Sequence, residues 1–278
     1  MLASFLKTFA KSDIHVSLKA EKLFDIGPLT VTNSMLYGLV ISILVGVVMI
    51  ASSKRIRINA RKGWASIVEI LIEFVVDLCE GVFGSRKKAV KFAPFFAVFF
   101  IFILFNNLAG VLPFVGASVT IGETPLFRPF TADLNGTIAM AVFAILLVQY
   151  LSIREQGGLG HLEHYFSDKP LNPINFFIGI LEVFGEFTRI MSLSLRLFLN
   201  TAVGEILIAV FASIILSSGR TPLSIIPIIL FEALVAGIQA YVFTVLSATY
   251  LGLAIAHSDE HEDEHHEEIT AKVEAAKA

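Results

Sequence analysis

The sequence predicts an all-α polytopic membrane protein with five membrane-embedded helices and one surface helix. Of its 278 residues, 55% are hydrophobic and only 16% are charged, and the mean hydropathy is +0.77. This composition is too apolar for an ordinary soluble domain. The apolar residues gather in five long stretches. We therefore expect an N-terminal segment 1–31, one membrane domain over residues 32–256, and a tail 257–278.

The first three apolar stretches predict simple transmembrane helices. They are Thr32–Ser53, Phe92–Leu112 and Gly136–Ile153. Each is about twenty residues long, which is the length of a helix that crosses ~30 Å of hydrocarbon. The single cysteine, Cys79, excludes an internal disulfide framework and a cysteine-based metal site.

Residues 64–83, between the first two spans, predict an amphipathic helix on the membrane surface. Their apolar residues recur at helical spacing and alternate with acidic residues, namely Glu69, Glu73, Asp77 and Glu80. Nine of the 21 Lys and Arg residues fall between Lys54 and Lys91. Positive residues mark the cytoplasmic side of a membrane protein. The N-terminus is therefore expected outside and the acidic, His-rich C-terminal tail in the cytoplasm.

The last two apolar stretches, Pro173–Leu216 and Leu223–Ala256, are too long for upright helices. At 1.5 Å per residue, forty-odd helical residues run for about 60 Å, which is twice the hydrocarbon thickness. Either each helix is broken, or both form a strongly tilted antiparallel hairpin (173–256) closed by Gly219 and Pro222. An inclined hairpin of this kind could wrap around a neighbouring object within the membrane.

This hairpin carries polar residues in a regular pattern. A helix turns by ~100° per residue. Four polar residues of the first helix therefore share one face, namely Glu182, Arg189, Arg196 and Asn200. Glu205 falls on the opposite face of the same helix. In the second helix Glu232 and Gln239 share a face. Glu205 and Glu232 should lie at similar depth near the outer side. Protonatable groups toward both surfaces with a fixed cation between them suit two half-paths separated by an electrostatic barrier.

Simpler explanations remain open for several of these residues. Glu186 and Arg189 can pair along one helical turn near the interface. Arg196 can form a structural ion pair with Glu205 or Glu232. Gln239 can be an interhelical hydrogen-bonding residue, which is a common use of polar side chains in membranes.

Four motifs resemble a known family. They are the run 192–200 (SLSLRLFLN) followed by Gly204 and Glu205, then Glu232 with the run 239–243 (QAYVF), and upstream the runs 107–114 (NLAGVLPF) and 131–135 (TADLN). In this order they are similar to subunit a of the bacterial F-type ATP synthase. The resemblance covers about residues 92–252.

The resemblance implies a role for each residue of the polar pattern. Arg196 is expected to face a rotating ring of c subunits, to hold an arriving ring carboxylate ionised, and to block direct proton passage. Protons would enter past Glu205 and Glu232 and leave past Glu182. Asn200 and Gln239 would position the guanidinium. Ser194 and Leu199 stand where relatives often have glycine or another small residue. Larger side chains at these two positions would alter how closely the ring approaches.

The resemblance also implies the partners and the location. The c-ring, the b subunits of the peripheral stalk and the lipid bilayer would be the partners, and the bacterial inner membrane the location. The sequence has no G-x-x-x-x-G-K-[ST] loop. We therefore expect this chain not to bind or hydrolyse nucleotide by itself. As a proton-channel subunit it is also expected to bind no nucleic acid, cofactor or metal and to be non-catalytic on its own.

Two other function classes can be weighed against this one. A secondary ion-coupled transporter could use the same buried Arg and Glu residues, but the sequence has no internal repeat of the kind that many transporters show. An intramembrane metalloenzyme would need metal ligands at membrane depth, but all seven histidines lie in predicted loops or tails. The tail segment His261–His265 does satisfy the zinc-protease pattern H-E-x-x-H. It lies in an acidic run, 258–268, where a solvated tail is the better explanation.

Overall fold

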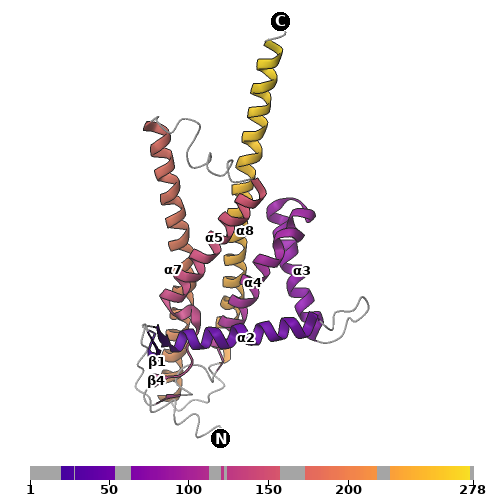
Figure 1. Ribbon diagram of the computed structural model, residues 1–278. Coiled ribbons are helices and arrows are strands. Elements are labelled where there is room, and N and C mark those ends of the chain that lie inside the picture. The colour runs from indigo at the N-terminus through magenta and orange to yellow at the C-terminus, as the bar shows by residue number, and fades with distance from the viewer. Residues whose placement is uncertain are drawn as a thin grey trace.

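The computed structural model describes residues 20–27, 29–53, 64–112, 120–121, 124–156, 173–217 and 226–275. Helices dominate this part of the chain (Figure 1). They are α2 (Asn33–Ser53), α3 (Trp64–Phe83), α4 (Arg86–Gly110), α5 (Leu134–Gln156), α7 (Pro173–Ser217) and α8 (Ile226–Ala275). All of these except α3 are long and apolar enough to cross a membrane. The predicted all-α polytopic membrane protein is confirmed.

Two short β-hairpins were not predicted. Strand β1 (Lys22–Ile26) pairs with β2 (Leu29–Thr32), and β3 (Thr120–Ile121) pairs with β4 (Thr124–Pro125), both antiparallel. A short 3₁₀ helix, η1 (Phe130–Ala132), follows β4. Strands β1 and β4 lie near the same end of α7 (Figure 1). Strands this short carry little alternation for a sequence pattern to reveal.

Helix α3 has the predicted bounds and packs antiparallel on α4. Gly84 ends α3 in the left-handed conformation, with φ of +64°, and its amide donates to Glu80 O at 2.9 Å. The side chains that face the core are Val68, Val75 and Cys79. The apolar residues Ile67, Ile70 and Phe74 are exposed instead. The helix therefore has three faces, of which one packs inward, one is apolar and outward, and one is acidic.

Helix α4 occupies the centre of the bundle, where it contacts α2, α3 and α8, while α5 contacts both α7 and α8. Buried alanines recur every fourth residue along α4, at Ala89, Ala93 and Ala97. Lipid tails are as apolar as these side chains, so close backbone approach and good packing must hold the bundle together. Small residues permit that approach. Aromatic pairs such as Phe99 with Phe243, at 5.7 Å between ring centroids, fill the remaining space.

Both long helices are continuous, so the broken-helix alternative is wrong. Helix α2 has 21 residues, a length that crosses the hydrocarbon upright, whereas α7 has 45. Helix α2 runs crosswise to α7, α8 and α3 (Figure 1). The tilt of α7 and α8 within the membrane and the position of α3 on its surface stay predictions.

Helix α8 continues past the predicted end of the apolar stretch at Ala256 and reaches Ala275. The acidic, His-rich segment, including His261–His265, therefore extends this helix, and Figure 1 shows it projecting away from the other helices. The turn with Gly219 and Pro222 lies outside the described residues, as do the basic residues Lys54–Lys62. The division into segments 1–31, 32–256 and 257–278 stays a prediction.

Candidate functional site

A small cavity between α7, α8, the end of α4 and the residue before η1 brings together two of the predicted carboxylates. Its volume is about 20 Å³, which is room for about one water molecule. Glu205 of α7 and Glu232 of α8 both line it, as the prediction of similar depth requires. The other lining residues are Asn107, Gly110, Val111, Pro129, Asn200, Thr201, Ile208, Val235 and Ala236.

Glu232 is buried against the backbone of the opposite helix. Only 8% of the residue is exposed. Its carboxylate lies over Gly204, where an added Cβ atom would come within 1.8 Å of Glu232 Oε1. Because Gly204 has no side chain, the Glu232 carboxylate can lie against α7 at this position. Gly204 immediately precedes Glu205 in the chain.

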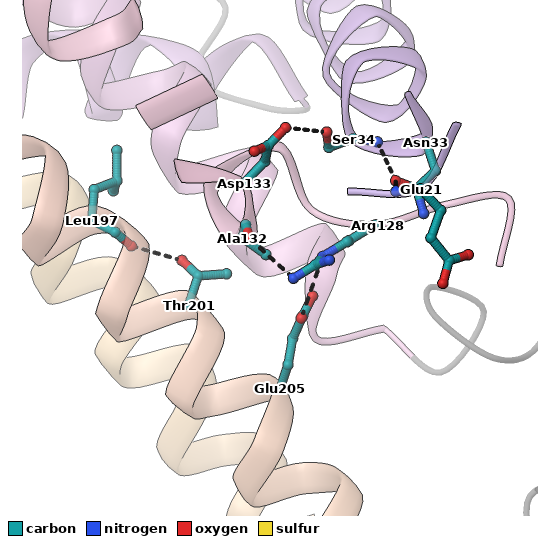
Figure 2. Close-up of polar contacts among 9 residues, drawn as sticks. All are labelled: Glu21, Asn33, Ser34, Arg128, Ala132, Asp133, Leu197, Thr201 and Glu205. Atoms are coloured by element: carbon teal, nitrogen blue, oxygen red, sulfur yellow. Dashed lines mark hydrogen bonds and ion pairs between the residues drawn. The ribbon is translucent and has the colours of Figure 1, made fainter. Parts of the chain in front are cut away.

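Arg128 pairs with Glu205 and was not predicted as a site residue. The Arg128 Nε atom lies 3.8 Å from Glu205 Oε2, and the guanidinium Nη2 donates to Ala132 O at 3.1 Å (Figure 2). The Arg128 side chain is 8% exposed. A lone arginine between β4 and η1 is not by itself a signal for a buried ion pair. Its position just before the TADLN motif is the only hint in the sequence.

The two upstream motifs contact each other beside the cavity. Thr131 Oγ1 of the TADLN motif donates to Asn107 Oδ1 of the NLAGVLPF motif at 2.6 Å. Ser34 Oγ, at the start of α2, donates to Asp133 Oδ2 at 2.8 Å (Figure 2). Asp133 also caps α5, because its Oδ1 accepts from the Asn135 amide at 3.1 Å. These bonds tie the start of α2, the end of α4 and the start of α5 together.

Asn200 and Gln239 join α7 to α8. Asn200 Nδ2 donates to Gln239 Oε1 at 3.3 Å. Gln239 is 4% exposed, and its Nε2 has no hydrogen-bond partner among the described residues. The interhelical hydrogen bond that was considered for Gln239 is therefore present. These two amides were expected to position the guanidinium of Arg196, but neither of them is hydrogen-bonded to it.

Arg196 lies on the exposed face of α7. Its neighbours on that face include Leu195, Leu199 and Val203, which are 37%, 52% and 49% exposed. Within the described part of the chain it makes no hydrogen bond and no ion pair. The alternative of a structural ion pair with Glu205 or Glu232 is therefore wrong for this structure.

Ser194 and Leu199 lie on different sides of α7. Ser194 is fully buried and its Oγ bonds Thr137 Oγ1 of α5 at 3.2 Å, whereas Leu199 is exposed. Of these two residues, Leu199 alone lies on the face that carries Arg196. The size of residue 194 affects the packing of α7 on α5.

Nearer the start of α7, Glu186 and Arg189 form the ion pair that the spacing predicted, with Arg189 Nη1 2.7 Å from Glu186 Oε1. The same guanidinium lies over the ring of Tyr250 in α8, 5.1 Å from its centroid. This contact links the two long helices again. Glu182 belongs to α7, but its side chain lies outside the described residues.

Comparison with known proteins identifies the family. The family model described as ATP synthase A chain matches residues 34–252. ATP synthase subunit a 2 of Chlorobaculum tepidum is 36% identical over 220 residues, which are 76% of this chain and 58% of that protein. ATP synthase subunit a of Anaeromyxobacter dehalogenans is 32% identical over 255 residues, with shares of 88% and 62%.

The corresponding protein of Moorella thermoacetica is 31% identical over 234 residues, which are 84% of this chain and 95% of that protein. The chain thus spans about three-fifths of the length of the first two relatives and nearly all of the third. The match includes all five candidate membrane spans almost completely, together with the cavity and Arg196. This chain belongs to the ATP synthase A chain family.

Proposed function

We propose that the chain is the stationary proton-conducting subunit in the membrane sector of a bacterial ATP synthase. A proton enters from the outer side through the cavity at Glu205 and Glu232 and passes to a carboxylate of the c-ring. After nearly a full turn of the ring it leaves past Glu182 to the cytoplasm. The b subunits of the peripheral stalk hold the chain stationary. ATP is made elsewhere in the complex.

The observation that carries this proposal is the division of charge across α7. Glu205 and Glu232 lie within the hairpin at one cavity, whereas Arg196 is on the exposed face. A guanidinium is always charged, and isolating it in hydrocarbon costs at least about 3 kcal/mol. An anionic partner in the membrane, such as a ring carboxylate, offsets this cost. Arg196 thus holds that carboxylate ionised and forms the barrier between the two half-paths.

The membrane potential sets how many protons are needed. One charge that crosses the membrane releases ~2.3 kcal/mol per 100 mV, so several protons are required for each ATP. Rotation follows because a ring carboxylate that has taken up a proton can enter lipid, whereas an ionised one is held by Arg196. In the proposed orientation the N-terminus is outside, the cavity opens outward, and the C-terminal end of α8 is cytoplasmic.

Cross-linking tests which face of α7 meets the ring. Leu199→Cys places a thiol on the face of Arg196, and Ser194→Cys is the matched control on the buried side of the same helix. We expect Leu199→Cys, paired with a cysteine near the ring carboxylate, to form a disulfide with the ring subunit. Ser194→Cys should not. Equal cross-linking of both positions, or of neither in an assembled complex, would contradict the proposed contact.

A further inference from the structure

Arg128 is a buried cation beside the outer cavity. Only 8% of its side chain is exposed, and Figure 2 shows the guanidinium between Ala132 and Glu205. One N–H group donates to Ala132 O at 3.1 Å. The Nε atom is buried, has no hydrogen-bond partner in the described part of the chain, and lies 3.8 Å from Glu205 Oε2. The guanidinium is thus directed at one wall of the cavity.

This cation changes the charge of a cavity that is rich in oxygen atoms. Two carboxylates line it, from Glu205 and Glu232, with Asn107, Asn200 and Thr201 beside them. With both carboxylates ionised, Arg128 brings the total charge from −2 to −1. Hard metal cations such as Ca²⁺ bind to carboxylate, carbonyl and water oxygens, and they bind more tightly as the number of charged ligands rises. Without Arg128 the wall of this cavity would have the ligand chemistry that such a cation prefers.

We propose that Arg128 is a specificity-determining residue that keeps metal cations out of the outer cavity while protons pass. By pairing with Glu205, it leaves Glu232 as the one uncompensated carboxylate on the wall. A proton needs no shell of six or more oxygen ligands, because it moves between carboxylates and water along hydrogen bonds. A metal cation needs that shell, and the ion pair with Arg128 leaves one of the two carboxylates, that of Glu205, already paired.

The proposal rests on the proposed function, because it assumes that protons cross this cavity. Two substitutions separate the charge of Arg128 from its packing. Arg128→Met removes the charge and keeps most of the side-chain volume. Arg128→Lys keeps the charge and is the matched control. Where Arg128→Met does not assemble into the complex, Arg128→Gln replaces it, because its amide can still donate to Ala132 O.

The experiment measures ATP-driven proton pumping by the whole complex in membrane vesicles whose nucleotide-binding side faces the medium. The lumen, on the side of the outer cavity, is loaded with CaCl₂ or with choline chloride of matched ionic strength. We expect half-inhibition of Arg128→Met at a lumenal Ca²⁺ concentration about tenfold lower than for the unaltered complex, because one opposing charge has been removed. Arg128→Lys should behave like the unaltered complex.

Ca²⁺ sensitivity of an assembled Arg128→Met complex equal to that of the unaltered complex would overturn the proposal. So would equal sensitisation of Arg128→Lys, because the charge would then not be the cause. The choline-loaded vesicles distinguish this failure from a failure of the proposed function. An unaltered, assembled complex that pumps no protons contradicts the proposed function, whereas pumping with a Ca²⁺-insensitive Arg128→Met complex contradicts the role of Arg128 alone.

Discussion

The carboxylate of Glu232 lies directly against the backbone of Gly204, so that a Cβ atom at residue 204 would approach Glu232 Oε1 to 1.8 Å. No pair of non-bonded heavy atoms tolerates that distance. The two long helices thus fit together at the cavity because α7 has no side chain at residue 204. Gly204 determines where the Glu232 carboxylate can be.

Gly204→Ala should displace the Glu232 carboxylate from the cavity and strongly reduce ATP-driven proton pumping, while the complex still assembles. The control is Gly46→Ala in α2, because an added Cβ there meets no atom within 4 Å. Alanine is the better helix former by about 1 kcal/mol, so the control should be neutral or slightly stabilising. Pumping rates of both variants in vesicles check this, and normal pumping by Gly204→Ala would show that the position of Glu232 is unimportant.

Ser34→Ala should destabilise the end of the bundle where α2 and α5 begin. It removes the hydroxyl that donates to Asp133 Oδ2 at 2.8 Å, in a place where both residues are buried. A buried acceptor that loses its partner costs about 1–3 kcal/mol. The control is Ser42→Ala, because the Ser42 hydroxyl bonds only Gly38 O within its own helix. Thermal denaturation of the detergent-solubilised complex should begin at a lower temperature for Ser34→Ala, and equal midpoints for the two variants would contradict the role of this bond.

Cys79 should resist thiol reagents in the folded protein. Its side chain, on α3, is fully buried against α4. Burial raises the pKa of its thiol to about 11. The reactive thiolate is therefore scarce at neutral pH and becomes abundant only as the pH rises through that pKa. We expect a maleimide to label Cys79 at pH 7 only after denaturation.

The control for Cys79 is an exposed cysteine on the acidic face of the same helix, Glu73→Cys in a Cys79→Ala background. It should be labelled readily under native conditions. Rapid native labelling of Cys79 would mean that α3 does not pack on α4 as described.

The sequence predicted the helices well because long apolar stretches and helical periodicity are local properties. The bounds of α3 and the pairing of Glu186 with Arg189 both follow from spacing within one helix. The shared depth of Glu205 and Glu232 was also predictable, because the distance of each from the turn can be counted along the chain. Helix lengths were enough to predict a tilted hairpin once the broken-helix alternative was excluded.

What could not be predicted depends on contacts between distant segments. Nothing in the spacing of α7 indicates that Arg128, from the segment between β4 and η1, pairs with Glu205. The burial of Ser194 against Thr137 likewise required the packing of α5 on α7. The inward face of α3 was missed because Val75 and Cys79 are no more apolar than Ile67 and Ile70, which are exposed. In a membrane both lipid and protein accept apolar side chains, so hydrophobicity alone does not distinguish a packed face from a lipid-facing one.

The most direct test of the central claim is Arg196→Ala in membranes that carry the whole complex. Two quantities are measured, namely ATP-driven proton pumping and passive proton leak through the membrane sector, with Arg154→Ala at the exposed end of α5 as the control. We expect Arg196→Ala to abolish pumping while the leak is retained or increased, because the barrier between the half-paths is lost. Normal pumping by Arg196→Ala would contradict the proposed role of this residue and favour an ion-coupled transporter instead.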